Sequence, residues 1–150
     1  MSRFVPGAAL LAVALSGALA GCAAYRGPQD ASPASGQATL VDTYWKLVRI
    51  DEAEITTAAD AREAHLILRP DHRVTGFAGC NTFTGSWQDE DGRISLGPLV
   101  STRMACADLG SEQRMLGALD GDILAELDGT TLIVTGADGT ELLFEARYAR

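Results

Sequence analysis

Residues 79–87 read Gly-Cys-Asn-Thr-Phe-Thr-Gly-Ser-Trp, and this stretch predicts a corner that leads into a strand. The β-branched and aromatic side chains of residues 82–88 favour a strand. Asn81 tolerates a left-handed backbone and can bond its own main chain, which suits a corner between two strands. Gly79 and Gly85 allow sharp bends or bulges. The stretch therefore indicates one strand of a curled sheet.

Short strands separated by turn residues continue on both sides of this stretch. Ala64, Leu66 and Leu68 share one face of a predicted strand. The pairs Asp128-Gly129 and Asp138-Gly139 are typical of tight hairpins, because glycine readily adopts a positive φ. The strands predicted in this way cover residues 43–50, 64–69, 73–79, 82–88, 93–96, 99–104, 123–127, 130–135 and 140–147.

One helix is predicted among these strands. Ser111 is placed as its N-cap, and Glu112 lies in its first turn, where the helix dipole favours a carboxylate. An apolar stripe recurs at helical spacing and consists of Met115, Leu116, Leu119 and Ile123. Gly117 weakens the helix by about 1 kcal/mol relative to alanine, so a short helix ending near Asp120 is expected. The expected fold class is α+β, a curved antiparallel sheet with one covering helix.

The N-terminal segment has the order of a secretion signal. Arg3 precedes a stretch without charged residues at positions 4–20, and its wholly apolar core at positions 8–15 is followed by small residues. A membrane-spanning anchor needs about 20 consecutive apolar residues, and Pro, Gly and Ser residues interrupt this shorter stretch. Residues 1–21 are therefore predicted to be a removable signal peptide.

The signal ends in Leu19-Ala20-Gly21-Cys22, which resembles the lipobox of bacterial lipoproteins. The resemblance implies a diacylglycerol on the Cys22 thiol, cleavage before Cys22 and acylation of the new amine, hence lasting membrane attachment. Ala23 follows, and not the Asp that bacterial sorting rules associate with the inner membrane. An outer-membrane lipoprotein of the cell envelope with a periplasmic domain is expected. The alternative is an ordinary signal peptide followed by a chance cysteine.

Two further cysteines, Cys80 and Cys106, lie in the segment predicted to fold. Outside the cytoplasm, an even pair favours a Cys80–Cys106 disulfide over two buried free thiols. Such a bridge would contribute about 3 kcal/mol by the chain-entropy model. A metal site is not predicted, because His65 and His72 are the only histidines and no C-x-x-C or H-x-x-x-H spacing occurs.

Composition sets the domain boundaries and excludes one class of partner. Residues 22–39 are rich in small and polar residues without apolar periodicity, which predicts a flexible tether. Residues 40–150 are predicted to be the folded domain. The 150-residue chain has 12 basic and 20 acidic residues, for a net charge of -8, so nucleic acid is not an expected partner.

The sequence carries no catalytic constellation. A G-x-S-x-G nucleophile elbow is absent. His65 projects from the face opposite Leu66 and Leu68, so it is predicted to face solvent, and His72 falls in a turn. Residues 89–92 lack the spacing of a calcium loop. No enzymatic activity, metal or cofactor is predicted.

Two separated motifs carry a family resemblance. Residues 79–87 match a pattern G-C-N-x-x-x-G-x-aromatic, and Thr102-Arg103-Met104-Ala105-Cys106 matches T-x-M-A-C, before a helix with an early Glu, here Glu112. Together with Trp45 in an opening strand, these motifs resemble the META-domain family of HslJ-like heat-shock lipoproteins. The resemblance covers about residues 42–147 and implies a cracked-barrel type of sheet. Trp87 stands where the family has Tyr.

The resemblance implies that the motif residues are architectural. These residues are Trp45, Gly79, Asn81, Gly85, Trp87, Thr102, Met104, Ala105 and Glu112. Met104 is expected to be an adaptable core filler. The implied function is non-catalytic, in stress tolerance or envelope maintenance through contacts with an envelope protein. The alternatives are a binding module for a hydrophobic ligand and an inhibitor of a periplasmic or host enzyme.

Overall fold

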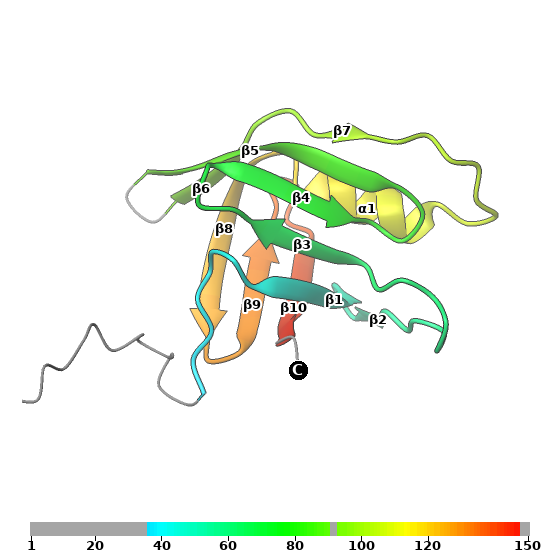
Figure 1. The fold of residues 1–150 in the computed structure, drawn as a ribbon, viewed down its shortest axis with the longest axis horizontal. Helices are drawn as coiled ribbons and strands as arrows, with labels where there is room; N and C mark the ends of the chain where they lie inside the picture. The colour runs from blue at the N-terminus through cyan, green and yellow to red at the C-terminus, as the bar shows by residue number, and fades with distance from the viewer. Residues whose placement is uncertain (1–35, 91–92, 148–150) are drawn as a thin grey trace, which may run out of the picture. The chain divides into compact units, whose positions relative to one another are not determined.

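The computed structural model of the protein describes residues 36–90 and 93–147, and most of its strands join in one closed ring (Figure 1). The elements are β1 (Tyr44–Ile50), β2 (Ala53–Glu54), β3 (His65–Leu68), β4 (Arg73–Phe77), β5 (Thr82–Glu90), β6 (Arg93–Leu96), β7 (Val100–Ser101), α1 (Gly110–Ala118), β8 (Gly121–Asp128), β9 (Thr131–Thr135) and β10 (Glu141–Arg147). Their pairing order is β10-β9-β8-β6-β5-β4-β3-β1, and β1 pairs again with β10. Among the described residues, eight strands thus form a barrel, to which β2 and β7 are attached at β1 and β5.

The closed barrel corrects the predicted fold class. The α+β fold with a curved sheet and a covering helix is wrong, because the first and last long strands pair with each other, with Trp45 opposite Ala146 and Leu47 opposite Phe144. All pairs between these strands are antiparallel. Alternation and turn residues reveal neighbouring hairpins, but they carry no signal for a pair between opposite ends of the domain.

The inside of the barrel is filled by side chains. Trp45, Leu47 and Phe144 from the two closing strands are at most 1% exposed, and Val74, Leu132 and Leu142 join them from other strands. On β4, Gly76 brings the backbone close to its neighbours, since a Cβ there would lie 2.3 Å from the Phe83 ring and 2.4 Å from the His65 carbonyl oxygen. The close approach leaves the ring space to turn inward.

The helix α1 lies across one end of the barrel. It contacts three connections at that end: the turn after β1, the corner between β4 and β5, and the turn after β9. Its side chains Met115, Ala118 and the following Leu119 are fully buried in the core. The helix therefore closes one end of the barrel. It does not form a second layer over a face of a sheet.

The ends of α1 differ from the predicted ones. The residue at the N-cap is Leu109, without a side-chain cap hydrogen bond, so the predicted cap Ser111 lies inside the first turn. Ile123, the last member of the predicted apolar stripe, lies in β8. The helix ends at Ala118, two residues before the predicted end near Asp120, and Gly121, with a φ of 87°, begins the next strand.

An ion pair fastens the middle of α1 to the β1 end. Arg114 donates to Asp51, which has a left-handed φ of 49° directly after β1. The other carboxylate oxygen of Asp51 accepts the backbone N–H of Glu141 at 2.9 Å. This backbone hydrogen bond, with the Arg114 guanidinium, lowers the pKa of Asp51. The turn thus connects the helix with both closing strands.

The segment before β1 crosses the opposite end of the barrel. Ala38, which is buried, donates its N–H to the Gly129 carbonyl at 2.8 Å, and the Trp45 Nε1–H donates to the Leu40 carbonyl at 2.9 Å. Val41 forms an isolated parallel bridge with Leu68. Ordered structure therefore includes Ala38, two residues before the predicted start of the domain at residue 40.

Most predicted strands agree with the observed ones. The two Asp-Gly hairpins are confirmed, with φ of 58° at Gly129 and 84° at Gly139. The strand predicted at residues 99–104 is shortened to Val100–Ser101, and the two-residue β2 was not predicted. Within the described ranges, no helix is long and apolar enough to span a bilayer.

Candidate functional site

The corner between β4 and β5 is held by the carboxylate of Glu112 from α1. Glu112 Oε2 accepts the backbone N–H of Cys80 at 3.2 Å and that of Asn81 at 2.7 Å, while Oε1 accepts Asn81 Nδ2–H at 2.8 Å. Glu112 is 8% exposed and Asn81 is 3% exposed. The three donors give both oxygens of this buried side chain a hydrogen-bond partner. Glu112 therefore binds a loop and does not cap its own helix.

The Asn81 side chain also forms hydrogen bonds with the segment after β7. Its Oδ1 accepts the Met104 backbone N–H at 2.7 Å and the Thr102 hydroxyl at 2.9 Å. Because both its oxygen and its nitrogen are engaged, the amide orientation is fixed by its partners. The corner predicted at Asn81 is present, and the residue with a positive φ there is Gly79, at 114°.

A disulfide between Cys80 and Cys106 reinforces the same corner. The predicted pairing is confirmed, with a Cα–Cα distance of 6.2 Å and a sequence separation of 26 residues. The bridge ties the corner to the segment that Asn81 binds. Glu112, Asn81 and the disulfide together join α1, the β4–β5 corner and the chain after β7.

The two tryptophans of the motifs are buried anchors. Trp45 is fully buried, and Trp87 is 7% exposed with its Nε1–H donating to the Arg69 carbonyl at 2.9 Å. Each ring thus fills the barrel while its polar atom finds a backbone partner. Gly85 lies under the chain before β7, where a Cβ would meet Leu99 at 2.7 Å.

Four motif residues are exposed, namely Gly79, Thr102, Met104 and Ala105. Met104 is 62% exposed, so its predicted role as a core filler is wrong, and Ala105 is exposed as well. The backbone of Met104 is what the corner uses, through the N–H donated to Asn81. Its side chain points away because the segment after β7 runs along the outside of the corner.

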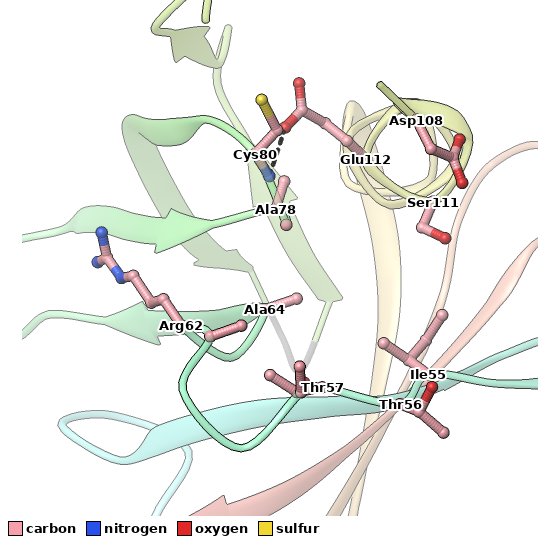
Figure 2. A pocket seen from close by; sticks show the side chains of 13 residues that line it. Ile55, Thr56, Thr57, Arg62, Ala64, Ala78, Cys80, Asp108, Ser111 and Glu112 are labelled. Atoms are coloured by element: carbon pink, nitrogen blue, oxygen red, sulfur yellow. Dashed lines mark hydrogen bonds between the residues drawn. The ribbon is translucent and has the colours of Figure 1, made fainter. Parts of the chain in front are cut away.

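A cavity of about 230 Å³ opens beside this corner (Figure 2). Glu112 reaches from α1 toward Cys80 above it, and the loop after β2 forms its lower wall (Figure 2). Its polar lining comes from Thr56, Thr57, Arg62, Asp108, Ser111 and Glu112. The loop residues 56–62 gave no sequence signal, since they match no motif and alternate with no clear period.

The charged groups around the cavity are engaged by the protein itself. Glu112 holds the corner, Asp108 accepts the Gly110 N–H at 2.8 Å, and the Arg62 guanidinium lies 4.6 Å from the centre of the Phe77 ring. In residues 36–90 and 93–147, no three His, Cys, Asp or Glu side chains are grouped to hold a metal ion. The hydroxyls of the lining can bind a small polar group, and the arrangement is otherwise structural.

His65 is buried, which corrects its predicted exposure. The strand alternation places it on the outer face as expected, but Tyr44 stacks on its ring at 4.2 Å and the Phe77 ring lies 6.5 Å away. Its Nδ1 is 2.8 Å from the Glu63 carbonyl oxygen, and the Lys46–Glu63 ion pair of 2.5 Å lies next to it. Burial lowers the pKa of His65, and the nearby Arg62 lowers it further.

Acidification should weaken the fold through His65. The folded protein holds His65 neutral, whereas the unfolded chain protonates it near its ordinary pKa of 6.5, so this contribution is complete above that pH and is lost below it. The free energy of unfolding, measured with urea between pH 7.5 and 5.5, should therefore fall. The decline should be smaller in His65→Gln; equal slopes in the parent protein and this variant would contradict the assignment.

Comparison with known proteins agrees with this geometry. The META domain profile matches residues 38–148. The chain belongs to the META-domain family. The META domain thus includes the barrel, the helix α1 that closes one of its ends, and the corner between β4 and β5 that joins them.

Solved structures share the fold of this META domain. An NMR structure of a protein from Burkholderia xenovorans has a TM-score of 0.61 and 24% identity, covering 83% of this chain and 99% of that one. A second NMR structure has a TM-score of 0.59 and 18% identity, covering 73% of this chain and 96% of that one. No relative among the curated proteins matches the chain.

The structure brings most of the predicted motif residues to the corner between β4 and β5. Glu112, Asn81, Thr102 and the disulfide meet there, while Trp45 and Trp87 lie in the barrel. Cys22, the predicted lipidation site, lies outside the described residues.

Proposed function

We propose that this META-domain protein is an outer-membrane-anchored lipoprotein of the cell envelope that acts through contacts with an envelope protein. Its task is non-catalytic, in stress tolerance or envelope maintenance. The observation that carries the proposal is the bonding of Glu112. Both oxygens of this buried acid accept hydrogen bonds from Cys80 and Asn81, so its role is structural. The lipobox ending in Cys22 supports the anchor.

The packed barrel disfavours the alternative of a hydrophobic-ligand carrier. A carrier of this kind needs an apolar cavity, whereas Trp45, Leu47 and Phe144 fill the barrel. The cavity beside the corner has hydroxyl and charged side chains in its lining. Binding through the outer surface therefore fits the molecule better, and an acidic chain of net charge -8 fits partners with basic groups.

The Cys22→Ser variant should lose membrane attachment. Without the thiol no diacylglycerol can be attached, and the loss of acyl chains removes about 0.8 kcal/mol of membrane affinity per buried CH₂. Fractionation of cells that produce the full-length chain should show the parent protein in the outer-membrane fraction and the variant in the soluble or precursor fraction. Cys106→Ser serves as the matched control and should remain with the membrane. Unchanged partitioning of Cys22→Ser would refute the anchor.

A further inference from the structure

The short strand β7 has a free edge beside the helix α1. On one side it pairs with β5, with Phe83 opposite Ser101 and Thr84 opposite Val100 (Figure 1). The chain continues this pairing, because Thr102 donates its N–H to the Thr82 carbonyl at 3.0 Å. Backbone groups in an antiparallel pair alternate in direction, so the N–H and C=O of Ser101 point away from β5. In the described part of the chain, no other backbone group bonds to them.

A groove of about 290 Å³ runs along this free edge. Leu99 and Ser101 line it from the strand side, and Leu116, Gly117 and Asp120 line it from the helix side. Leu99 and Leu116 supply apolar side chains, Ser101 and Asp120 supply polar ones, and Asp120 is the one charged residue of the lining. The groove therefore joins unpaired backbone groups to a surface of mixed apolar and polar character, which a strand with alternating side chains can cover.

Gly117 lines this groove, and neither a close contact nor its backbone angle requires a glycine at this position. A glycine inside a helix costs about 1 kcal/mol relative to alanine. A Cβ added at Gly117 would meet nothing within 4 Å, and its φ is not in the left-handed region. By contrast, a Cβ at Gly76 or Gly136 would clash with backbone atoms. The missing side chain at Gly117 leaves room for another chain to approach the helix closely.

The outer face of the same edge carries the two most exposed large apolar side chains of the described residues. Val100 is 68% exposed and Met104 is 62% exposed. A strand added along β7 would place alternate side chains beside Val100 and Met104 on the outer face, and the others in the groove over Leu116 and Gly117. One partner segment would thus cover both exposed surfaces.

We propose that an extended segment of a partner protein adds to β7 as a further strand. The segment has apolar side chains that enter the groove and a Lys or Arg that meets Asp120. Arg103 lies two residues after the end of β7, so an acidic residue of the partner fits beside it. This inference rests on the proposed function through protein contacts and names the surface and the partner's chemistry.

Charge argues against two other occupants. A second copy of the chain would bring together two molecules that each carry a net charge of -8. An anionic membrane surface would be repelled for the same reason. A separate protein segment with a basic residue meets neither obstacle.

Site-specific photo-cross-linking in the full-length, membrane-attached chain tests the proposal. A photo-reactive benzoyl-phenylalanine in place of Val100 should give a light-dependent adduct with an envelope protein. Mass spectrometry of the adduct should locate the cross-link in an extended segment with a Lys or Arg. Adding Ser101→Pro removes the N–H that faces the partner and leaves the pairing with β5 intact, so the adduct yield should fall about tenfold.

Control variants separate docking from folding. Gly117→Gln fills the groove and should lower the yield about tenfold, whereas Leu124→Ser removes an exposed side chain of β8 that is 52% exposed and should leave the yield unchanged. Gly117→Ala should raise the melting temperature of the free protein by about 4 °C, because a better helix former enters open space. A lower melting temperature would give Gly117 a role within the fold and overturn the inference.

The other possible results of the cross-linking experiments also test the inference. Adduct yields that resist both Ser101→Pro and Gly117→Gln, or an adduct between two copies of this chain, would overturn the inference. A benzoyl-phenylalanine at Leu124 that captures an envelope protein, with none captured from Val100, would overturn the docking site and leave the proposed function standing. If no envelope protein is captured from either position or by an amine-reactive cross-linker, the proposed function is refuted as well.

Discussion

The Asn81→Asp variant should lose about 3 kcal/mol of stability, because it places two buried carboxylates face to face. In the parent protein, Asn81 Nδ2 donates to Glu112 Oε1 at 2.8 Å. Its Oδ1 is already committed to Met104 and Thr102, so the side chain cannot turn its oxygen elsewhere. Urea unfolding at pH 7 with the disulfide intact measures the loss.

A second substitution should rescue this variant. Glu112→Gln alone keeps an oxygen for the Cys80 and Asn81 N–H groups, but its amide then faces the Asn81 amide, donor against donor, at a cost of about 2 kcal/mol. In the double variant Asn81→Asp/Glu112→Gln, the new amide donates to the new carboxylate. The double variant should therefore be more stable than Asn81→Asp, with a favourable coupling energy in the cycle. Additive losses would show that the two side chains do not interact as described.

Loss of the Cys80–Cys106 disulfide should cost about 3 kcal/mol, the chain-entropy value for a bridge of this span. The double variant Cys80→Ala/Cys106→Ala should still fold, because Glu112 and Asn81 continue to hold the corner. Urea unfolding should show a lower midpoint for the variant, and the oxidised parent should gain two hydrogens in mass on reduction.

The control for this measurement is the reduced parent protein. Its stability should match that of the double alanine variant, since both lack the cross-link and keep the corner's hydrogen bonds. A Cys22→Ser background removes the third thiol from both proteins and prevents exchange. Equal stability of oxidised and reduced protein would contradict a stabilising bridge.

Local sequence patterns were sufficient for most of the strands and for the two Asp-Gly hairpins. The Asp-Gly pairs at residues 128–129 and 138–139 predicted turns that the positive φ values confirm. The alternation of Ala64, Leu66 and Leu68 predicted one buried face, and all three are buried. Each of these signals depends on residues that are close in the sequence, where backbone preferences act directly.

The errors concern contacts between distant segments. His65 was placed on the correct face of its strand, but its burial depends on Tyr44 and Phe77 from other strands. Met104 has an apolar side chain, yet the corner uses its backbone and leaves the side chain exposed. The closure of the barrel between β1 and β10 likewise has no local signature.

The role of Glu112 shows why the site was only partly predictable. Its place in the first helical turn predicted only a position where the helix dipole favours a carboxylate. The three donors that the carboxylate accepts come from a corner about 30 residues earlier, with sequence separations of 31 and 32. The motif identified the residue, whereas its partners required the fold.

The pairing of β1 with β10 has a consequence for the time course of folding. Tyr44 pairs with Arg147, so the ring cannot close until almost the whole domain is available to the chain. Contacts between such distant residues form slowly, on the millisecond-to-second scale of barrels with non-local pairing. Until then β1 and β10 each present an unpaired edge, which is a template for aggregation. A chain cut before Glu141 would leave β1 and β9 with unpaired edges indefinitely.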